Sequence, residues 1–147
     1  MTTNIVFVCH ANYCRSPVAE YLLKSFGDKN LNITSAGIDP IGIPSMDPRS
    51  MDYLKRNDIP FDIHTPKRIT SNIIKSSDII FSLDYSIFFK LKSNFLSANI
   101  TMINHSNKET DTSDPFKYSD IEDYFNCMDN ISSLINYIYK NVSKFQR

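Results

Sequence analysis

The sequence of 147 residues has few cysteines, no excess of either charge and no long apolar run. Its three cysteines form an odd and sparse set, which is not the framework of a disulfide-stabilised secreted protein. The 16 lysines and arginines balance the 16 aspartates and glutamates, so no net charge draws the chain to nucleic acid or to an anionic membrane. No apolar stretch approaches the ~20 residues that cross a bilayer, and the first residues lack the basic start and apolar core of a signal peptide. We therefore expect a cytoplasmic protein that binds neither nucleic acid nor membranes, and any anion must be bound by a local site.

The sequence also lacks a metal-binding motif and any boundary between domains. The three histidines, His10, His64 and His105, lie far apart in the sequence and lack the spacing of metal ligands, so we expect no metal and no cofactor. The chain contains no repeat, linker or low-complexity segment, and its length suits one domain with its own core. We expect residues 1–147 to form a single domain.

Apolar runs and helical periodicities alternate along the chain, the first predicting strands and the second predicting helices. The expected strands cover residues 5–8, 31–36, 78–83 and 99–103, the expected helices about 17–26, 48–57, 73–74, 85–94 and 120–142, and the loops 38–46, 58–68 and 104–118. Phe26 and Ile121 are expected on the apolar faces of the first and last helices. The alternation predicts an α/β fold with a four-stranded parallel sheet and helices on both faces. Ligands of such folds bind beyond the carboxyl ends of the strands, where Cys9 is expected.

The loop between the first strand and the first helix reads CHANYCR, from Cys9 to Arg15. A loop in this place aims several backbone N–H groups at one point, and the helix adds the positive end of its dipole. Ser16 is expected to be the N-cap and Pro17 the first helical residue. Arg15 can bind an oxyanion with its fork of donors, and the same field favours the thiolate form of Cys9. We therefore predict a phosphate-binding loop with Cys9 as an in-line nucleophile.

The spacing of Cys9 and Arg15 is weak evidence when taken alone. Three cysteines and five arginines produce such a match by chance in about one chain in ten. Cys9 by itself also fits a small buried hydrophobe at the end of a strand. The context favours the phosphate loop, because the cysteine follows a buried strand and the arginine directly precedes the start of a helix.

The segment from Val8 to Pro17 resembles the signature of the low-molecular-weight protein tyrosine phosphatases. Further segments follow in the order of that family, namely Ser35-Ala36-Gly37, Asp47-Pro48-Arg49, Ile59-Pro60, His64 to Ile69, Ile79 to Asp84 and Asp114-Pro115-Phe116. The resemblance covers most of the chain, and its first and last segments together are highly specific. It implies a phosphatase that hydrolyses phosphotyrosine esters through a phosphocysteine intermediate.

The resemblance also implies a role for each residue of the site. Cys9 attacks phosphorus, Arg15 clamps the phosphate, and Asp114 protonates the leaving oxygen and then activates water. The residues that bind the phosphate or its ester are His10, Ala11, Asn12, Tyr13, Cys14 and Phe116. The supporting residues behind the loop are Ser16, as a hydroxyl donor to the thiolate, and Ser35 and His64, as partners of Asn12.

Without the resemblance, several of these residues have plainer explanations. Asp114-Pro115 is a common start of a turn, and an isolated histidine such as His64 is more often structural than functional. Asn12 suits a sharp bend, since asparagine tolerates the left-handed backbone conformation. Asp84 matches a position of the family, but no chemical role is assigned to it.

Some positions depart from the family pattern. Ala11 stands where glycine is usual, so its methyl group must avoid the phosphate and a positive φ is unfavourable. Tyr13 replaces a smaller residue, and Lys117 replaces a common second aromatic residue. The loop at residues 38–42 is short and offers only Ile41 as a pocket wall. The chemistry is unaffected by these changes, but the walls that select the substrate differ from the family pattern.

Three alternatives to a tyrosine phosphatase remain open: a phosphoarginine phosphatase, a phosphate-binding module without turnover, and a thiol redox sensor based on Cys9 and Cys14. Arsenate reductases of this fold use further cysteines near residue 80, and none lies between Cys14 and Cys127, so that activity is disfavoured. The expected partners are phosphotyrosine proteins or peptides, a bacterial tyrosine kinase among them, and the expected state is a monomer or weak dimer. Mild peroxide is expected to link Cys9 reversibly to Cys14.

Overall fold

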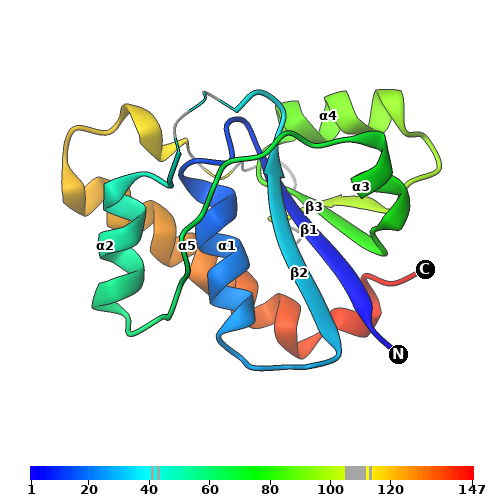
Figure 1. The fold of residues 1–147 in the computed structure, drawn as a ribbon, viewed down its shortest axis with the longest axis horizontal. Coiled ribbons are helices and arrows are strands. Elements are labelled where there is room, and N and C mark those ends of the chain that lie inside the picture. Colours follow the sequence, from blue (N-terminus) through cyan, green and yellow to red (C-terminus); the bar gives the residue numbers. More distant parts are fainter. Residues whose placement is uncertain (41, 43, 105–111, 113) are drawn as a thin grey trace.

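The computed structural model describes residues 1–40, 42, 44–104, 112 and 114–147 and contains a four-stranded parallel sheet (Figure 1). Its strands are β1 (Thr3–Cys9), β2 (Leu31–Gly37), β3 (Ile79–Ser82) and β4 (Ile100–Met102). They pair in the order β2-β1-β3-β4, and every pairing is parallel. This confirms the predicted α/β fold. Ile41, His105 and much of the predicted loop at 104–118 lie outside the described residues.

Helices cover both faces of the sheet, as predicted (Figure 1). They are α1 (Arg15–Lys24), α2 (Pro48–Arg56), α3 (Ser71–Ser76), α4 (Tyr85–Asn94) and α5 (Ile121–Lys140), with short 3₁₀ helices η1 (Pro115–Lys117) and η2 (Val142–Lys144). Helices α1, α2 and α5 lie on one side of the sheet, and α3 and α4 lie on the other. In the part of the chain that the structure describes, no helix is long and apolar enough to cross a membrane.

The centre of the sheet is the core of the protein. Residues Ile5 to Cys9 of β1 are all buried, because neighbouring strands flank β1 and helices cover both of its faces. Phe7 stacks on Phe81 of β3 with ring centroids 5.4 Å apart. The apolar stripe of α5 is buried against this core at Tyr124, Phe125, Met128, Ile131, Leu134, Ile135 and Ile138.

Two apolar residues do not take their predicted inward places. Phe26 is 38% exposed because α1 already ends at Lys24, and its ring stacks instead on Tyr139 at 4.1 Å between centroids. Ile121 is 39% exposed because it is the first residue of α5, ahead of the turn where the helix meets the core. The predictions for these two side chains were wrong.

The start of α1 also differs from the prediction. The helix begins at Arg15, and its N-cap is Cys14, which makes no side-chain cap bond. Ser16 is therefore not the N-cap, because its hydroxyl faces Cys9 and Asn12 instead of a helix N–H group. Pro17 becomes the third helical residue, where its missing N–H removes no intrahelical hydrogen bond. The result places Arg15 itself at the positive end of the helix.

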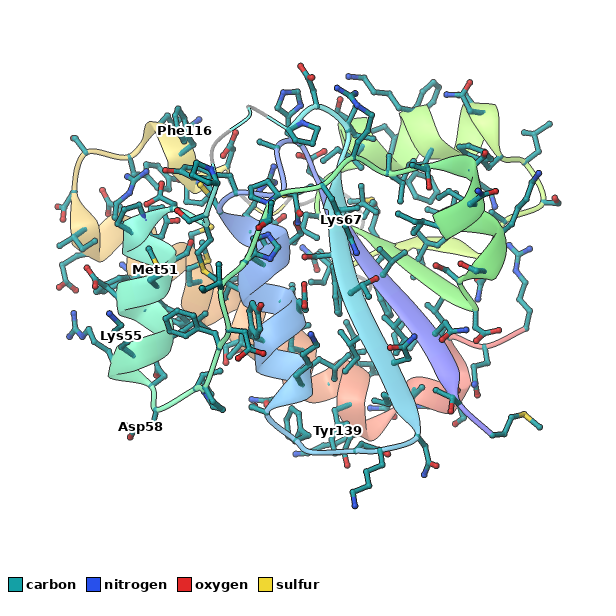
Figure 2. The ribbon with its side chains drawn as sticks, in the orientation of Figure 1. Met51, Lys55, Asp58, Lys67, Phe116 and Tyr139 are labelled. Atoms are coloured by element: carbon teal, nitrogen blue, oxygen red, sulfur yellow. The ribbon has the colours of Figure 1, made fainter. Side chains whose placement is uncertain are left out.

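The carboxyl ends of the strands and the start of α1 form one end of the molecule. Figure 2 shows Phe116 at this end, near the loop that leaves β1, and Tyr139 at the opposite end. Because β1 delivers Cys9 and α1 begins with Arg15, the loop between them is held by a strand and a helix that are both packed into the core.

Candidate active site

The loop from Cys9 to Arg15 bends sharply at Asn12, which has a φ of +56°. The amide nitrogen of its fully buried side chain donates to the hydroxyls of Ser16 at 2.8 Å and Ser35 at 2.9 Å. Its side-chain oxygen accepts from the backbone N–H of Lys67 at 3.0 Å, and Nε2–H of His64 donates to its backbone carbonyl at 3.1 Å. These four bonds from three segments stabilise a left-handed backbone that asparagine tolerates and most residues avoid. The predicted bend at Asn12 is confirmed.

Ala11 does not need the conformational freedom of the glycine that is usual at its position. Among the described residues other than glycine, only Asn12 and Asp58 have a positive φ. The bend is therefore made one residue later, and the Ala11 methyl group causes no backbone strain. The unusual residue at this position is compatible with a phosphate loop of ordinary shape.

Gly37, at the end of β2, lets the loop pack closely against the sheet. A Cβ atom at this position would lie 2.7 Å from the backbone nitrogen of Asn12 and 2.8 Å from the carbonyl carbon of Ala11. Both neighbours are backbone atoms of the same loop, so neither can move aside without displacing the loop. Only glycine fits here, which explains the glycine that closes the Ser35-Ala36-Gly37 segment.

A hydrogen-bonded chain runs from Cys9 into the protein. The Sγ atom of Cys9 lies 2.9 Å from the hydroxyl of Ser16. Because Ser16 accepts from Asn12, its own proton is free for Cys9, and its other acceptor, the Ala36 carbonyl, is more distant at 3.5 Å. A hydroxyl that points at the sulfur can donate a hydrogen bond to it. The structure therefore places Ser16 beside Cys9, as predicted, with the hydroxyl proton directed at the sulfur.

The far end of this chain is Glu20, which the sequence analysis missed. Ser35 accepts from Asn12 and donates to Glu20 at 2.5 Å, and Lys24 pairs with the other Glu20 oxygen at 2.6 Å. Glu20 thus fixes the direction of the Ser35 hydroxyl, which in turn orients Asn12. Burial lowers the pKa of the nearby His64, so the ring is neutral near pH 7.

Arg15 is a buried cation that pairs with a partly buried carboxylate. Its side chain is 3% exposed, and Nη1 lies 3.1 Å from Oδ2 of Asp84 and 3.4 Å from the carbonyl oxygen of Thr112. Burial lowers the pKa of Arg15, but the negative charges of Cys9, Asp84 and Asp114 outweigh this and raise it. The guanidinium is therefore a permanent positive charge beside Cys9.

Asp84 has two tasks that the sequence did not reveal. It pairs with Arg15, and its other oxygen caps α4 by accepting from the backbone N–H of Ile87 at 2.9 Å. The sequence signal that could have revealed the pairing with Arg15 is an acidic residue directly after the predicted strand at residues 78–83. Such a residue lies at the same sheet edge as Cys9.

An open cavity of about 130 Å³ lies over the loop. Its lining residues are Cys9, His10, Ala11, Tyr13, Cys14, Arg15, Asp114 and Phe116. The rings of Tyr13 and Phe116 meet edge to face, with centroids 6.2 Å apart, and Phe116 is exposed at the rim. The structure thus brings together the three predicted catalytic residues and two of the predicted wall residues, Tyr13 and Phe116. Asn12, which was predicted to bind the phosphate, is fully buried and does not line the cavity, because its side chain bonds to residues behind the loop. With Ser16, Ser35 and His64 it supports the loop from behind.

Asp114 enters the cavity from a different part of the chain. It precedes η1, and its Oδ1 atom accepts from the backbone N–H of Phe116 at 3.1 Å. This contact fixes the carboxylate relative to the Phe116 wall. Lys117, which stands where a second aromatic residue is common, is exposed and does not line the cavity. Within the described residues, no three His, Cys, Asp or Glu side chains gather as metal ligands would.

Comparisons with known proteins agree with this geometry. A family model described as low molecular weight phosphotyrosine protein phosphatase matches residues 4–147. Arsenate reductase 1 of Staphylococcus saprophyticus is 37% identical over 79 residues, which cover 54% of this chain and 58% of that protein. The low molecular weight protein-tyrosine-phosphatase Wzb of Salmonella typhi is 26% identical over 121 residues, which cover 81% and 80%.

A solved structure described as a mutant of the YwlE arginine phosphatase with a phosphorylated active-site serine has a very similar fold. It superposes with a TM-score of 0.86 and 26% sequence identity, and the match covers 97% of both chains. These similarities link the chain to a phosphatase family, with relatives that differ in the substrates their names give.

Proposed function

The chain belongs to the low molecular weight phosphotyrosine protein phosphatase family, and from this membership we propose that it hydrolyses aryl phosphate monoesters through a phosphocysteine intermediate. The observation that carries the proposal is the cavity that contains Cys9, Arg15 and Asp114 together, with the Ser16 hydroxyl 2.9 Å from the Cys9 sulfur. A nucleophile, an anion clamp and an acid around one cavity are the three groups that this reaction requires.

In the first step, the Cys9 thiolate attacks phosphorus, so that an S–P bond forms and the bond to the ester oxygen breaks. Asp114, as the carboxylic acid, gives its proton to the leaving oxygen. Arg15 and the N–H groups of the loop bind the remaining oxygens, on which negative charge is redistributed in the transition state. The products of this step are the free alcohol and phosphorylated Cys9.

In the second step, the Asp114 carboxylate takes a proton from water as the water oxygen attacks phosphorus. The S–P bond breaks, phosphate leaves, and Cys9 returns as the thiolate. The Ser16 hydroxyl stabilises the sulfur anion both before the first step and as it departs in the second. Asp114 ends the cycle protonated, ready for the next ester.

We place phosphotyrosine first among the substrates because the cavity walls are aromatic. Tyr13 and Phe116 offer apolar faces to a phenyl ester, whereas a short alkyl phosphate reaches neither. Phosphotyrosine proteins or peptides, a bacterial tyrosine kinase among them, are the proposed partners. A phosphoarginine phosphatase is the second candidate, favoured by the similarity to the YwlE arginine phosphatase.

Steady-state kinetics decide between these substrates. The assay compares p-nitrophenyl phosphate, a phosphotyrosine peptide, a phosphoarginine peptide with the same flanking residues, and phosphoserine. Higher kcat/KM for the phosphotyrosine peptide supports the proposal, and higher kcat/KM for the phosphoarginine peptide supports the second candidate. Hydrolysis of none of them, together with tight vanadate binding, would show a binding module without turnover.

Replacing Tyr13 by alanine is expected to weaken the recognition of aryl esters. Burial of a phenyl ring against two aromatic walls contributes about 1–3 kcal/mol, which corresponds to roughly a tenfold to hundredfold preference. Tyr13→Ala should therefore raise KM for phosphotyrosine about tenfold and leave KM for a small alkyl phosphate nearly unchanged. Tyr137→Ala, at an exposed tyrosine outside the cavity, is the control. An equal change for both esters would show that Tyr13 is not a selecting wall.

A regulatory disulfide between Cys9 and Cys14 is proposed for the same loop. Peroxide would oxidise the Cys9 thiolate to sulfenic acid, and the Cys14 thiol would then form the disulfide with loss of water. Burial raises the pKa of Cys14, and its thiol points toward Oδ2 of Asp47 at 3.5 Å, so we expect this second step to be slow. Peptide mapping after mild peroxide, with and without dithiothreitol, tests it. Recovery of Cys9 only as sulfinic or sulfonic acid refutes the proposal.

A further inference from the structure

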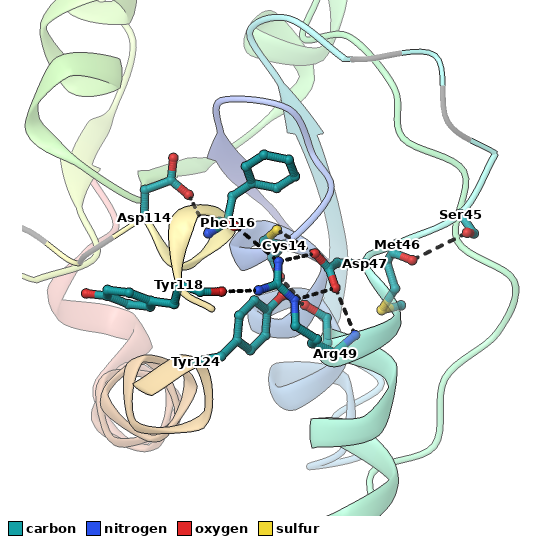
Figure 3. Close-up of polar contacts among 10 residues, drawn as sticks. Cys14, Ser45, Met46, Asp47, Arg49, Asp114, Phe116, Tyr118 and Tyr124 are labelled. Atoms are coloured by element: carbon teal, nitrogen blue, oxygen red, sulfur yellow. Dashed lines mark hydrogen bonds and ion pairs between the residues drawn. The ribbon is translucent and has the colours of Figure 1, made fainter. Parts of the chain in front are cut away.

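Arg49, in the first turn of α2, contacts the wall segment that carries Asp114 and Phe116 (Figure 3). Its Nη1 donates to the carbonyl oxygen of Tyr118 at 2.7 Å, and its Nη2 donates to the carbonyl oxygen of Phe116 at 3.3 Å. The guanidinium lies over the ring of Tyr124, 4.3 Å from its centroid. Arg49 therefore links α2 to two backbone carbonyls, those of Phe116 and Tyr118, in the segment that follows Asp114.

The same guanidinium also binds Asp47, the N-cap of α2. Nε and Nη2 of Arg49 donate to the two Asp47 oxygens at 3.1 and 2.8 Å. Burial raises the pKa of Asp47, but the hydrogen bonds from Arg49 outweigh it and keep the pKa below its ordinary value. The two residues therefore form a charged pair that is intact at neutral pH.

Asp47 and its neighbour Ser50 hold the phosphate loop from the other side. The backbone N–H of Asp47 donates to the carbonyl oxygen of Tyr13 at 2.9 Å. The Ser50 hydroxyl donates to the carbonyl oxygen of Cys14, also at 2.9 Å. One turn of α2 is therefore bonded both to the loop that carries Cys9 and, through Arg49, to the segment that carries Asp114.

The contacts on Phe116 show how this link reaches the acid. The N–H of Phe116 donates to Asp114, and its carbonyl accepts from Arg49, so the two side chains bind the same residue. We propose that Arg49 is a positioning residue that keeps Asp114 at the correct distance from Cys9. The proposal rests on the proposed function. A change of about 1 Å in such a distance costs on the order of a hundredfold in rate.

Only an arginine can make this set of contacts. A guanidinium presents five N–H donors in a fixed plane, enough for a carboxylate and two carbonyls at once. Lysine retains the charge but cannot bind three acceptors in that plane. Methionine retains an unbranched side chain but loses the charge, every donor and the guanidinium that lies over Tyr124. Comparison of the two variants therefore separates the loss of the planar set of hydrogen bonds from the loss of the charge.

The test measures kcat/KM for Arg49→Met, Arg49→Lys and the wild type with aryl phosphates whose leaving phenols differ in acidity. We expect Arg49→Met to slow esters of weakly acidic phenols about tenfold to a hundredfold, because these need the acid most, and p-nitrophenyl phosphate no more than about threefold. Arg49→Lys should lie between, and vanadate affinity should not change. Arg56→Met is the matched control, because Arg56 lies on the same helix over the ring of Phe125 at 4.8 Å.

Equal slowing of every ester in Arg49→Met, or loss of vanadate affinity, would overturn the proposal. Amide hydrogen exchange over residues 114–118 gives a readout that is independent of turnover. Faster exchange there in Arg49→Met than in Arg56→Met supports the link to the wall, and unchanged exchange overturns it. If the wild type hydrolyses none of the esters, the proposed function fails, while the exchange result still decides whether Arg49 holds the wall.

Discussion

A Cys9→Ser variant is expected to lose turnover by more than about 10⁴-fold, as in other enzymes whose nucleophile is removed, while vanadate still binds. A serine hydroxyl at this position is not ionised near neutral pH and is a poor nucleophile. The binding groups are the loop N–H groups and Arg15, which the substitution leaves in place. The Ser16 hydroxyl that faces the sulfur does not change this, because it can stabilise an anion but cannot remove a proton from serine.

The measurement is the initial rate with p-nitrophenyl phosphate beside a vanadate titration of the same preparation. Cys127→Ser is the matched control, since Cys127 is also buried but does not line the cavity. It should retain activity within about threefold, as expected of a conservative change outside the site. Activity of Cys9→Ser within tenfold of the wild type would exclude the covalent mechanism.

Asp114→Asn is expected to slow esters of weakly acidic phenols by about 10²–10⁴-fold, the usual contribution of a general acid. The effect on kcat/KM for p-nitrophenyl phosphate should be much smaller, because kcat/KM reports only formation of the phosphocysteine and p-nitrophenolate leaves without a proton. The amide keeps an oxygen that can accept from the N–H of Phe116, so the wall should stay in place. The substitution thus removes the proton and little else.

A series of aryl phosphates with different leaving groups measures this effect. Asp120→Asn is the control, because Asp120 also caps a helix, accepting from the N–H of Glu122 at 2.8 Å, and does not line the cavity. If Asp114→Asn lowers kcat/KM equally for good and poor leaving groups, then Asp114 is not the acid.

The sheet and the phosphate loop could be predicted from the sequence because their signals are local. Strand β1 is buried on both faces and therefore reads as a continuous apolar run that ends at Cys9. The sharp bend needed a residue that tolerates a positive φ, and Asn12 stands at that point. The α1 N-cap could not be predicted in the same way, because the Ser16 hydroxyl bonds to groups at the site instead of to its own helix.

The partners of Arg15 and Arg49 could not be predicted because they are distant in sequence or carry no side-chain signal. Asp84 follows β3, and only the pairing of β3 with β1 brings it to Arg15. Arg49 binds backbone carbonyls, which every residue has, so no pattern marks them. Gly37 was visible as a glycine, but its reason, the approach of the Asn12 backbone, exists only in the folded protein.

The central claim is that phosphate is carried by Cys9 during turnover. The most direct test is to quench the wild-type enzyme with acid while it hydrolyses p-nitrophenyl phosphate, and to locate phosphate on its peptides by mass spectrometry. Asp114→Asn should give more of the modified peptide, because the same residue activates the water that removes the phosphate. Phosphate on Cys9 that is absent from the Cys9→Ser variant is the predicted result. Phosphate on another residue, or rapid turnover with no phosphorylated peptide in either the wild type or Asp114→Asn, would contradict it.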